Sequence, residues 1–469
     1  MGLGLVRITL LLSALSLISG QEMPDWAAQR AAGGAASIAV IDCKTNTWVY
    51  RGNAEEALSV ASVTKLFPAA AALLELGPDH VFHTRLIAPG PISGGTIPFL
   101  GVLPSGSPCL DEHFTDRQPD RLFAGWAEQL HQAGLRRIDG DLIIDNRLFT
   151  GPIKPPTYRN DHATAQRWYS APASAFAFND NCIEVRVVPT QPGERAQVEV
   201  RPRSPRIEVI NRTKTVTANP SNGIVVSRAH HSNTITVSGR YNQVTSWFPL
   251  AIHQDPDLLA GDHLAAALRD RGIHIAGKVH LGAVAEGEVL VDHQDPLLPA
   301  LDILNQRSQN FYGEQILRVV GATVSGEGSI SAGAQATLSV VRDHLGLEMA
   351  SVTLLDGSGL SYGNMASAAD ICRLLQALDR HGDGDRFRQT HGDRFRQTLK
   401  EKKHGLVTAR VKTGTLNIAR CLAGYIPGPN GENYAFAILL NRADANSIGW
   451  ANQLRDKAFG DMCEILGKP

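Results

Sequence analysis

The pattern of apolar and polar residues along the chain predicts a mixed α and β fold. Residues 36–51 hold two apolar runs around Lys44-Thr45-Asn46, which predicts a β-hairpin. Residues 62–76 are apolar on nearly every face, so a helix there must be buried on all sides. Residues 183–240 alternate apolar and polar positions in short runs broken by Pro, Gly and Asn, a pattern typical of a small all-β module.

Segments on both sides of that module predict further elements. A helix-like segment followed by a strand at 140–145 lies within residues 120–148, and the remaining expected elements follow residue 295. These are helices over 299–320, 331–345 and 366–380, a strand over 407–414, a hairpin from strands 421–426 and 434–440, and an amphipathic helix over 447–466. A hairpin and buried helix at one end, with strands and a helix at the other, favour one domain split by a long insertion.

Length and composition place the chain among globular proteins. Its 469 residues suggest about three domains, and 43% hydrophobic with 19% charged residues is usual for a soluble fold. The net charge of -1 gives no indication of binding to nucleic acid or to an anionic membrane.

The N-terminus is typical of an export signal. Arg7 precedes an apolar run from Ile8 to Ile18, and the small residues Ser19-Gly20 follow, which predicts a signal peptide over 1–20. The run is too short to span a bilayer, and a buried N-terminal helix is the alternative. We therefore expect an exported, periplasmic protein with no transmembrane segment in the mature chain.

The cysteines and histidines give no metal pattern. Six cysteines in an exported chain permit three disulfides, but four lie in apolar stretches where buried free thiols fit equally well, so no pairing is predicted. They are Cys43, Cys109, Cys182, Cys372, Cys421 and Cys463. Sixteen histidines are scattered, with His230-His231 in the β-rich module, and surface roles are expected for them. No metal and no cofactor is predicted.

Three short motifs carry the chemistry, in the order S-x-x-K, S-x-N and K-T-G. They are Ser62-Val63-Thr64-Lys65, Ser308-Gln309-Asn310 and Lys412-Thr413-Gly414, and each pattern occurs once. Each alone has an ordinary explanation, such as a helix cap or a strand end. Together and in this order they are the motif set of active-site-serine β-lactamases and penicillin-binding proteins.

The first motif predicts a serine nucleophile and its base. Lys65 follows Ser62 by about one helical turn, so both side chains can emerge on one face. A serine hydroxyl needs a base, and a lysine acts as one only if burial or a nearby cation lowers its pKa. The apolar helix and Lys412 would supply both conditions.

The other two motifs predict proton relay and substrate binding. The Ser308 hydroxyl can relay a proton between Lys65 and a leaving amine, and the Asn310 amide can accept from Lys65 and donate to a substrate carbonyl. Lys412 and Thr413 would bind a terminal carboxylate. Gly414 would let a peptide approach the strand edge closely, and the backbone N–H groups of Ser62 and Thr415 would form an oxyanion hole. The segment Asp356–Gly359 is either a plain turn or part of the site.

The chain resembles penicillin-binding protein 4 type D-alanyl-D-alanine carboxypeptidase/endopeptidases, the class C low-molecular-mass penicillin-binding proteins. The long stretch between Lys65 and Ser308 is the most specific point of resemblance. Further similar segments are GDLIIDNRLF (140–149), YSAPASAFAFNDNCIEVRV (169–187), RSQNFYGEQILR (307–318), DGSGLS (356–361) and KTGTLN with AGYI (412–426).

The resemblance implies an α+β fold: a penicillin-recognising, β-lactamase-like domain with an antiparallel sheet flanked by helices, split by an insertion of two largely β domains. The implied division is a catalytic domain (21–78 and 290–469), an inserted α/β domain (79–170 and 245–289) and a nested β domain (171–244). It also implies that Ser62 is acylated, that Lys65 is its base, and that Asp145 faces the free amine of a diaminopimelate side chain.

Two departures from the family concern specificity. Tyr362 stands after DGSGLS, where the family often carries an Arg that binds a substrate carboxylate. The stretch before K-T-G holds a duplicated GDRFRQT (384–390 and 392–398), to which we assign no function.

The leading hypothesis is a serine DD-peptidase that cleaves D-Ala-D-Ala or D-Ala–diaminopimelate bonds of peptidoglycan stem peptides and is inhibited by β-lactams. The alternatives are a β-lactamase or esterase, distinguished by fast deacylation, and a non-catalytic peptidoglycan-binding scaffold with a relic site. No partner besides stem peptides and β-lactams is predicted, and the oligomeric state is left open.

Overall fold

The computed structural model describes residues 23–111, 113–116, 118–158, 166–221, 223–229, 232–380, 391–442 and 448–467. The predicted signal peptide, His230-His231 and the first GDRFRQT copy lie outside these residues. Within them, no helix is both long enough and apolar enough to cross a bilayer.

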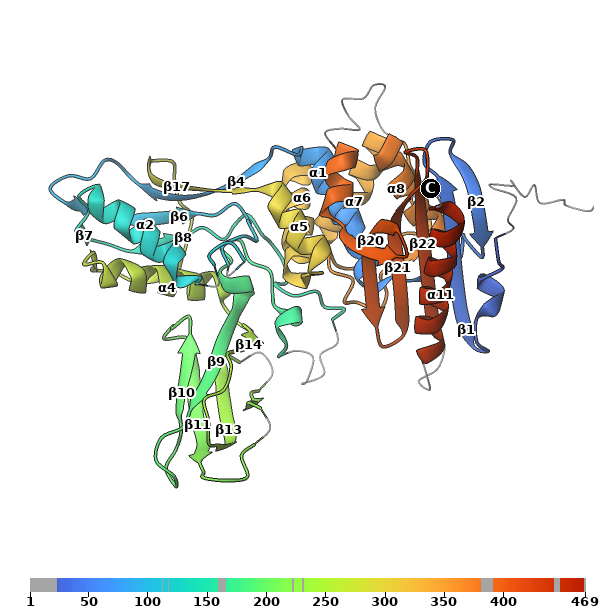
Figure 1. Cartoon of the computed structure of the whole chain (residues 1–469). Coiled ribbons are helices and arrows are strands. Elements are labelled where there is room, and N and C mark those ends of the chain that lie inside the picture. Colours follow the sequence, from blue (N-terminus) through green and yellow to red (C-terminus); the bar gives the residue numbers. More distant parts are fainter. Residues whose placement is uncertain are drawn as a thin grey trace, which may run out of the picture.

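A six-stranded antiparallel sheet is built from both ends of the chain. Its strand order is β19-β20-β21-β22-β1-β2, so the N-terminal hairpin pairs with the C-terminal strands (Figure 1). The strands are β1 (Gly34–Asp42), β2 (Thr47–Gly52), β19 (Lys400–His404), β20 (Val407–Leu416), β21 (Ala419–Pro427) and β22 (Asn433–Arg442). The predicted discontinuous arrangement of this sheet is thereby observed.

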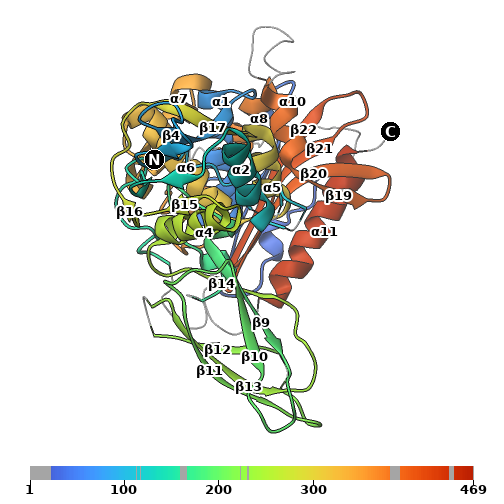
Figure 2. The same cartoon turned by 90° about the vertical axis from the view of Figure 1, so that its left-hand side faces the viewer.

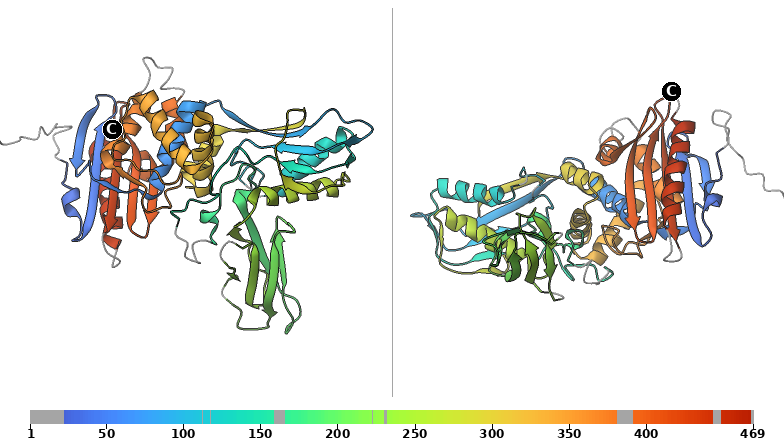
Figure 3. Two further views of the ribbon diagram at one scale, coloured as in Figure 1. Left: turned by 180° about the vertical axis from the view of Figure 1, so that it is seen from behind. Right: turned by 60° about the horizontal axis from the view of Figure 1, so that its bottom comes forward.

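Helices cover both faces of this sheet. In β22, alternate residues belong to different cores: Ala437 and Leu439 join the core that contains α1 and α8 residues, whereas Phe436 and Ile438 join the core that contains α11 residues. The ribbon views show helices on either side of the sheet (Figure 3). The helices are α1 (Leu66–Leu76), α5 (Leu297–Gln306), α6 (Asn310–Ser325), α7 (Ile330–Leu345), α8 (Ala368–Arg380), α10 (Asp393–Thr398) and α11 (Gly449–Leu466).

Between α1 and α5 the chain leaves this body and builds a second one. A five-stranded sheet, ordered β16-β8-β6-β4-β17, packs with α2 and α4 around a separate hydrophobic core (Figure 1). Its elements are β4 (Val81–Ala88), β6 (Leu100–Leu103), α2 (Asp120–Gln132), β8 (Leu142–Ile144), α4 (Pro256–Asp270), β16 (Val279–Leu281) and β17 (Glu288–Pro296). A small parallel sheet of β5 (Thr96–Ile97), β7 (Arg137–Ile138) and β15 (His274–Ile275) accompanies it.

Two three-stranded sheets form a β module that projects from the rest of the molecule (Figure 2). They share a further core. Their orders are β10-β9-β14 and β11-β13-β12, from β9 (Cys182–Val188), β10 (Gln197–Arg201), β11 (Glu208–Thr215), β12 (Val225–Ser227), β13 (Thr234–Tyr241) and β14 (Phe248–Ala251). The separate cores agree with three packed bodies, while the residue boundaries proposed for the domains remain predictions.

Two predicted elements differ from the structure in detail, and one observed strand was not predicted. The segment expected as one helix over 62–76 begins as a 3-10 turn, η2 (Ala61–Lys65), and becomes α-helical at Leu66. Pro68 therefore lies in the first α-helical turn, where its missing N–H has no intrahelical acceptor to lose. The helix expected over 299–320 is two helices that break at the S-x-N motif, and β19 was not predicted because its sequence, KEKKH, is mostly charged.

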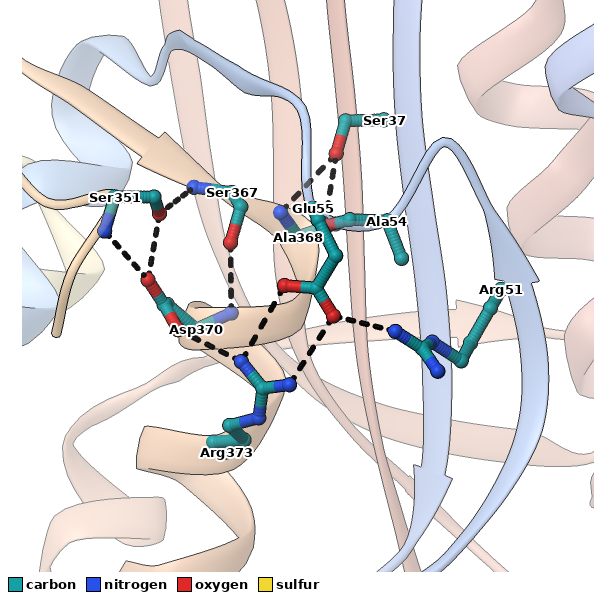
Figure 4. Close-up of polar contacts among 9 residues, drawn as sticks. All are labelled: Ser37, Arg51, Ala54, Glu55, Ser351, Ser367, Ala368, Asp370 and Arg373. Atoms are coloured by element: carbon teal, nitrogen blue, oxygen red, sulfur yellow. Dashed lines mark hydrogen bonds and ion pairs between the residues drawn. The ribbon is translucent and has the colours of Figure 1, made fainter. Parts of the chain in front are cut away.

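A partly buried polar network anchors the loop that carries DGSGLS. Asp370 accepts hydrogen bonds from the backbone N–H and the hydroxyl of Ser351 (3.2 and 2.6 Å), and Arg373 donates to both Asp370 (2.9 Å) and Glu55 (3.1 Å) (Figure 4). The Ser351 hydroxyl accepts from the backbone N–H of Ser367 (2.9 Å). Ser351 and Ser367 flank the loop, so this network fixes where it starts and ends.

Asp370→Ala should lower the midpoint of thermal unfolding by a few degrees, because it leaves half-buried donors of Ser351 without their acceptor, at about 1 kcal/mol or more. Asp343→Ala is the control, since it removes an exposed carboxylate paired with Arg342 on α7. Scanning calorimetry of both variants tests this, and equal shifts would contradict a stabilising role for the network.

All six cysteines are buried free thiols in this structure. Burial raises the pKa of each thiol, for example that of Cys421 to about 12. The sequence left both disulfides and buried free thiols open for the six cysteines, and the structure has free thiols.

We expect a thiol reagent such as dithionitrobenzoate to label no cysteine in the native protein and all six after unfolding in guanidinium, because only an exposed thiolate reacts. Fewer than six thiols in the unfolded, unreduced sample would mean that disulfides form.

Candidate active site

Ser62 is held at a tight junction between β3 (Ala57–Ser59) and η2. Ala61 adopts a left-handed backbone conformation (φ 48°), which turns the chain into η2. Gly359 packs against the Ala61 carbonyl and Gly414 against the Val60 carbonyl, and a Cβ atom at either glycine would overlap these atoms. Ser62 itself stays half-buried, whereas Lys65 is fully buried.

This packing gives Gly414 a use that the motif did not predict. Its missing side chain makes room for the carbonyl oxygen of Val60 and the Cβ atoms of Ala61 and Cys421, while the expected close approach of a peptide to Gly414 stays a prediction. The glycine is thus explained by the approach of β20 to the segment that carries Ser62.

Lys65 joins three parts of the chain. Its ammonium nitrogen Nζ lies 3.0 Å from Ser62 Oγ and 2.7 Å from Asn310 Oδ1, and it also donates to the carbonyl oxygen of Ser358. The first two contacts are those that the motifs predicted. The contact with Ser358 places the DGSGLS segment in the site, which decides between the two possibilities left open for Asp356–Gly359.

The S-x-N motif lies between α5 and α6. Ser308 has a left-handed backbone (φ 57°), and Asn310 is the first residue of α6. The Asn310 amide accepts from Lys65 through Oδ1 and donates through Nδ2 to the carbonyl oxygen of Tyr169 (2.8 Å). The expected donation of this amide to a substrate carbonyl would need the other N–H of the same group.

The K-T-G motif lies within β20. Lys412 is buried and its Nζ donates to Ser308 Oγ (2.8 Å), which connects the second and third motifs. Thr413 and Thr415 are exposed. β19 pairs with β20 only as far as Val411, so the same edge of residues 412–416 pairs with no strand in the described part of the chain. That edge is available to an extended peptide.

Burial dominates the electrostatics of both lysines. It lowers the pKa of Lys65 to about 7, although the carboxylates of Asp356 and Glu314 act in the opposite direction. It also lowers the pKa of Lys412 well below the usual value, assisted by the charges of Lys65 and Lys400. A lysine with a pKa near 7 can hold a neutral amine at physiological pH, which is the requirement for a base.

A cavity of about 410 Å³ opens beside Ser62. Residues of the first two motifs line it, together with Thr415 directly after K-T-G, Tyr362 and other residues that the motifs did not predict. The latter are Trp168, Tyr169, Arg307, Gly359, Leu360, Leu416, Asn417 and Arg420. Two arginines and no Asp or Glu occur among these lining residues, so the cavity favours an anionic group.

Sequence analysis did not find Trp168 or Arg420 because no motif or periodicity marks them. Trp168 is 41% exposed at the cavity wall, and Arg420 donates to the carbonyl oxygens of Leu416 and Ala419. The position of Trp168 and Arg420 in the site follows only from the fold, which brings distant segments of the chain together around Ser62.

Asp145 does not line this cavity. It lies after β8, and its carboxylate accepts bidentate hydrogen bonds from Arg147 (2.9 and 2.6 Å) and one from the backbone N–H of Val284 (3.0 Å). The carboxylate is thus engaged within the second body, and this geometry lends no support to its predicted contact with a substrate amine.

One cluster has the composition of a metal site. Asp111, His113 and Asp180 bring ligand atoms within 4.8 Å of one another. However, Tyr312 donates to Asp111, and the guanidinium group of Arg307 contacts His113 Nδ1 at 2.8 Å. The cluster is therefore tied into protein hydrogen bonds beside a cation, an environment that opposes a metal ion.

Comparison with known proteins now decides the family. The model of the D-Ala-D-Ala carboxypeptidase 3 (S13) family matches residues 21–455. The chain belongs to this family. It is 32% identical over 439 residues to a D-alanyl-D-alanine carboxypeptidase of Actinomadura sp. (strain R39), covering 87% of this chain and 78% of that protein.

Two further comparisons agree with this assignment. The chain is 26% identical over 403 residues to D-alanyl-D-alanine carboxypeptidase DacB of Haemophilus influenzae, covering 81% and 80% of the two chains. The crystal structure of penicillin-binding protein 4 from H. influenzae superposes with a TM-score of 0.75 at 22% identity, covering 93% of this chain and 98% of that one. The predicted family, fold class and enzyme class, a serine DD-peptidase of peptidoglycan, are confirmed.

Proposed function

We propose that Ser62 is the nucleophile of this peptidase and is acylated by peptidoglycan stem peptides that end in D-Ala-D-Ala or are cross-linked through D-Ala. The observation that carries the proposal is the contact of Ser62 Oγ with the buried Lys65 amine at the mouth of the cavity. The geometry pairs a hydroxyl with a base in the way that covalent catalysis requires.

Acylation would proceed as follows. The neutral Lys65 amine takes the proton of Ser62 Oγ while that oxygen bonds to the carbonyl carbon, and the oxyanion is held by the backbone N–H groups of Ser62 and Thr415. The C–N bond then breaks, and the leaving amine receives a proton through the Ser308 hydroxyl. A later water releases the product by attack on the ester. Lys412 and Thr413, with the nearby arginines of the cavity, would bind the terminal carboxylate of the substrate.

The β-lactamase alternative finds less support. Rapid deacylation needs a base for the attacking water, and no Asp or Glu is among the described residues that line the cavity. The scaffold alternative does not explain why the nucleophile, its base and the connected Ser308–Lys412 pair are all assembled in contact.

A structure of the H. influenzae protein in complex with a β-lactam superposes on this chain with a TM-score of 0.71 at 22% identity. We extend β-lactam inhibition to this chain as part of the proposal, together with export of the mature protein to the periplasm.

Incubation with benzylpenicillin should give a stable covalent adduct in intact-mass spectra of the wild type and none in Ser62→Ala. The reason is that Ser62 provides the acylated oxygen and no carboxylate base of the cavity speeds hydrolysis. An adduct that vanishes within seconds would favour the β-lactamase alternative. If the protein forms this adduct but releases no D-Ala from muropeptides, the proposed peptidase activity is contradicted.

The acylation rate should rise with pH and reach half of its maximum near pH 7, the pKa of Lys65, because the ammonium form that prevails at lower pH cannot accept the Ser62 proton. Stopped-flow measurements with a fluorescent penicillin between about pH 5 and pH 9 test this. Lys65→Arg is the control, since a guanidinium stays protonated and should give no acylation at any of these pH values. A flat profile in the wild type would mean that Lys65 is not the base.

A further inference from the structure

The carboxyl group of Glu314 lies behind the site and takes no part in the steps proposed above. Glu314 is 1% exposed and follows Asn310 by one helical turn on α6. Its Oε1 accepts from the Tyr158 hydroxyl (2.8 Å) and from the backbone N–H of Ser358 (3.0 Å). Its Oε2 is buried, and no described residue forms a hydrogen bond with it. Such a group is costly to bury, which calls for an explanation from function.

The contacts of Glu314 lead directly to the base. The carbonyl oxygen of Ser358 accepts a hydrogen bond from Lys65 Nζ, and the backbone N–H of Ser358 donates one to Glu314 Oε1. One residue of the loop thus lies between the buried carboxyl and the buried amine. Asn310, one turn earlier on the same helix, contacts Lys65 from the other side.

We infer that Glu314 is a positioning residue that sets both the place and the protonation of Lys65, acting through the backbone of Ser358. This inference rests on the proposed role of Lys65 as the base. Held by Glu314, the Ser358 carbonyl fixes the amine near Ser62 Oγ. A negative charge on Glu314 then favours the protonated amine, together with the charge of Asp356 and against the larger effect of burial.

The charges around the pair agree with this role. Burial, assisted by the charge of Asp356, raises the pKa of Glu314 to about 7, the same range to which burial lowers that of Lys65. An ionised Glu314 favours the ammonium form of Lys65, and a protonated one favours the neutral amine. The other groups that face Glu314 and Lys65 are Tyr158, Asp356, Arg318 and Lys412. The charge of Lys65 lowers the pKa of Lys412.

The test is the pH profile of acylation by a fluorescent penicillin in Glu314→Gln. Glutamine keeps an acceptor for Tyr158 and Ser358 but carries no charge, so Lys65 should lose its proton more easily and the acidic limb should move down by about one pH unit. Glu314→Leu also removes the acceptor, and its maximal rate should fall by about tenfold or more because the Ser358 peptide is no longer held. A purely structural role would lower the maximal rate and leave the limb in place.

Two further variants serve as a second test and as a control. Tyr158→Phe removes a hydrogen bond that favours ionised Glu314, so its acidic limb should move in the same direction even if Glu314→Gln folds poorly. Glu75→Gln removes an exposed carboxylate on the helix that follows Lys65 and should leave the profile unchanged. Acidic limbs of Glu314→Gln and Tyr158→Phe that coincide with the wild type would overturn the inference. Acylation that persists in Ser62→Ala would instead overturn the proposed function, so the two failures are distinguishable.

Discussion

The burial of one lysine amine is the constraint on which the rest of this structure depends. A fall in the pKa of Lys65 from 10.5 to about 7 means that its surroundings disfavour the ammonium relative to the amine by roughly 5 kcal/mol. The amine is held in its place by acceptors from three separate segments, Ser62, Asn310 and Ser358. A chemically useful lysine thus requires a fold that brings all three together and keeps water out.

The architecture meets this requirement by closing one body from both ends of the chain. β1 pairs with β22, so the N-terminal hairpin is fixed beside the strands that follow K-T-G. α1 then runs through the core against α6 and α7, which carries Lys65 to Asn310. The inserted stretch from β4 to β17 can leave the first body and return to it because its two ends pair with each other, at Val81 and Pro296 for example. Insertion therefore does not disturb the contacts around the amine.

Much of this arrangement could be predicted from the sequence. Residues 62–76 are apolar on nearly every face, and such a helix must be buried on most sides. The three motifs, taken in order, predicted the contacts of Lys65 with Ser62 and Asn310. The 3-10 turn at Ala61–Lys65 was not predictable, since it follows from tertiary contacts of Gly359 and Gly414 with the preceding backbone. Asp145 was assigned by resemblance alone, and the local geometry shows its carboxylate engaged by Arg147.

The same reasoning explains why Glu314 was overlooked and why it matters. In the sequence it is one polar residue inside an amphipathic helix, for which a solvent-facing position is the ordinary expectation. Only the fold shows that this face of α6 is turned toward Tyr158 and the loop of Ser358. The Ser358 peptide alone lies between this buried carboxyl and the Lys65 amine, so a charge on either group acts on the other across a short stretch of protein interior. The protonation of Glu314 and the protonation of Lys65 therefore depend on each other. The site is better described as two buried groups that titrate together than as one lysine with a lowered pKa.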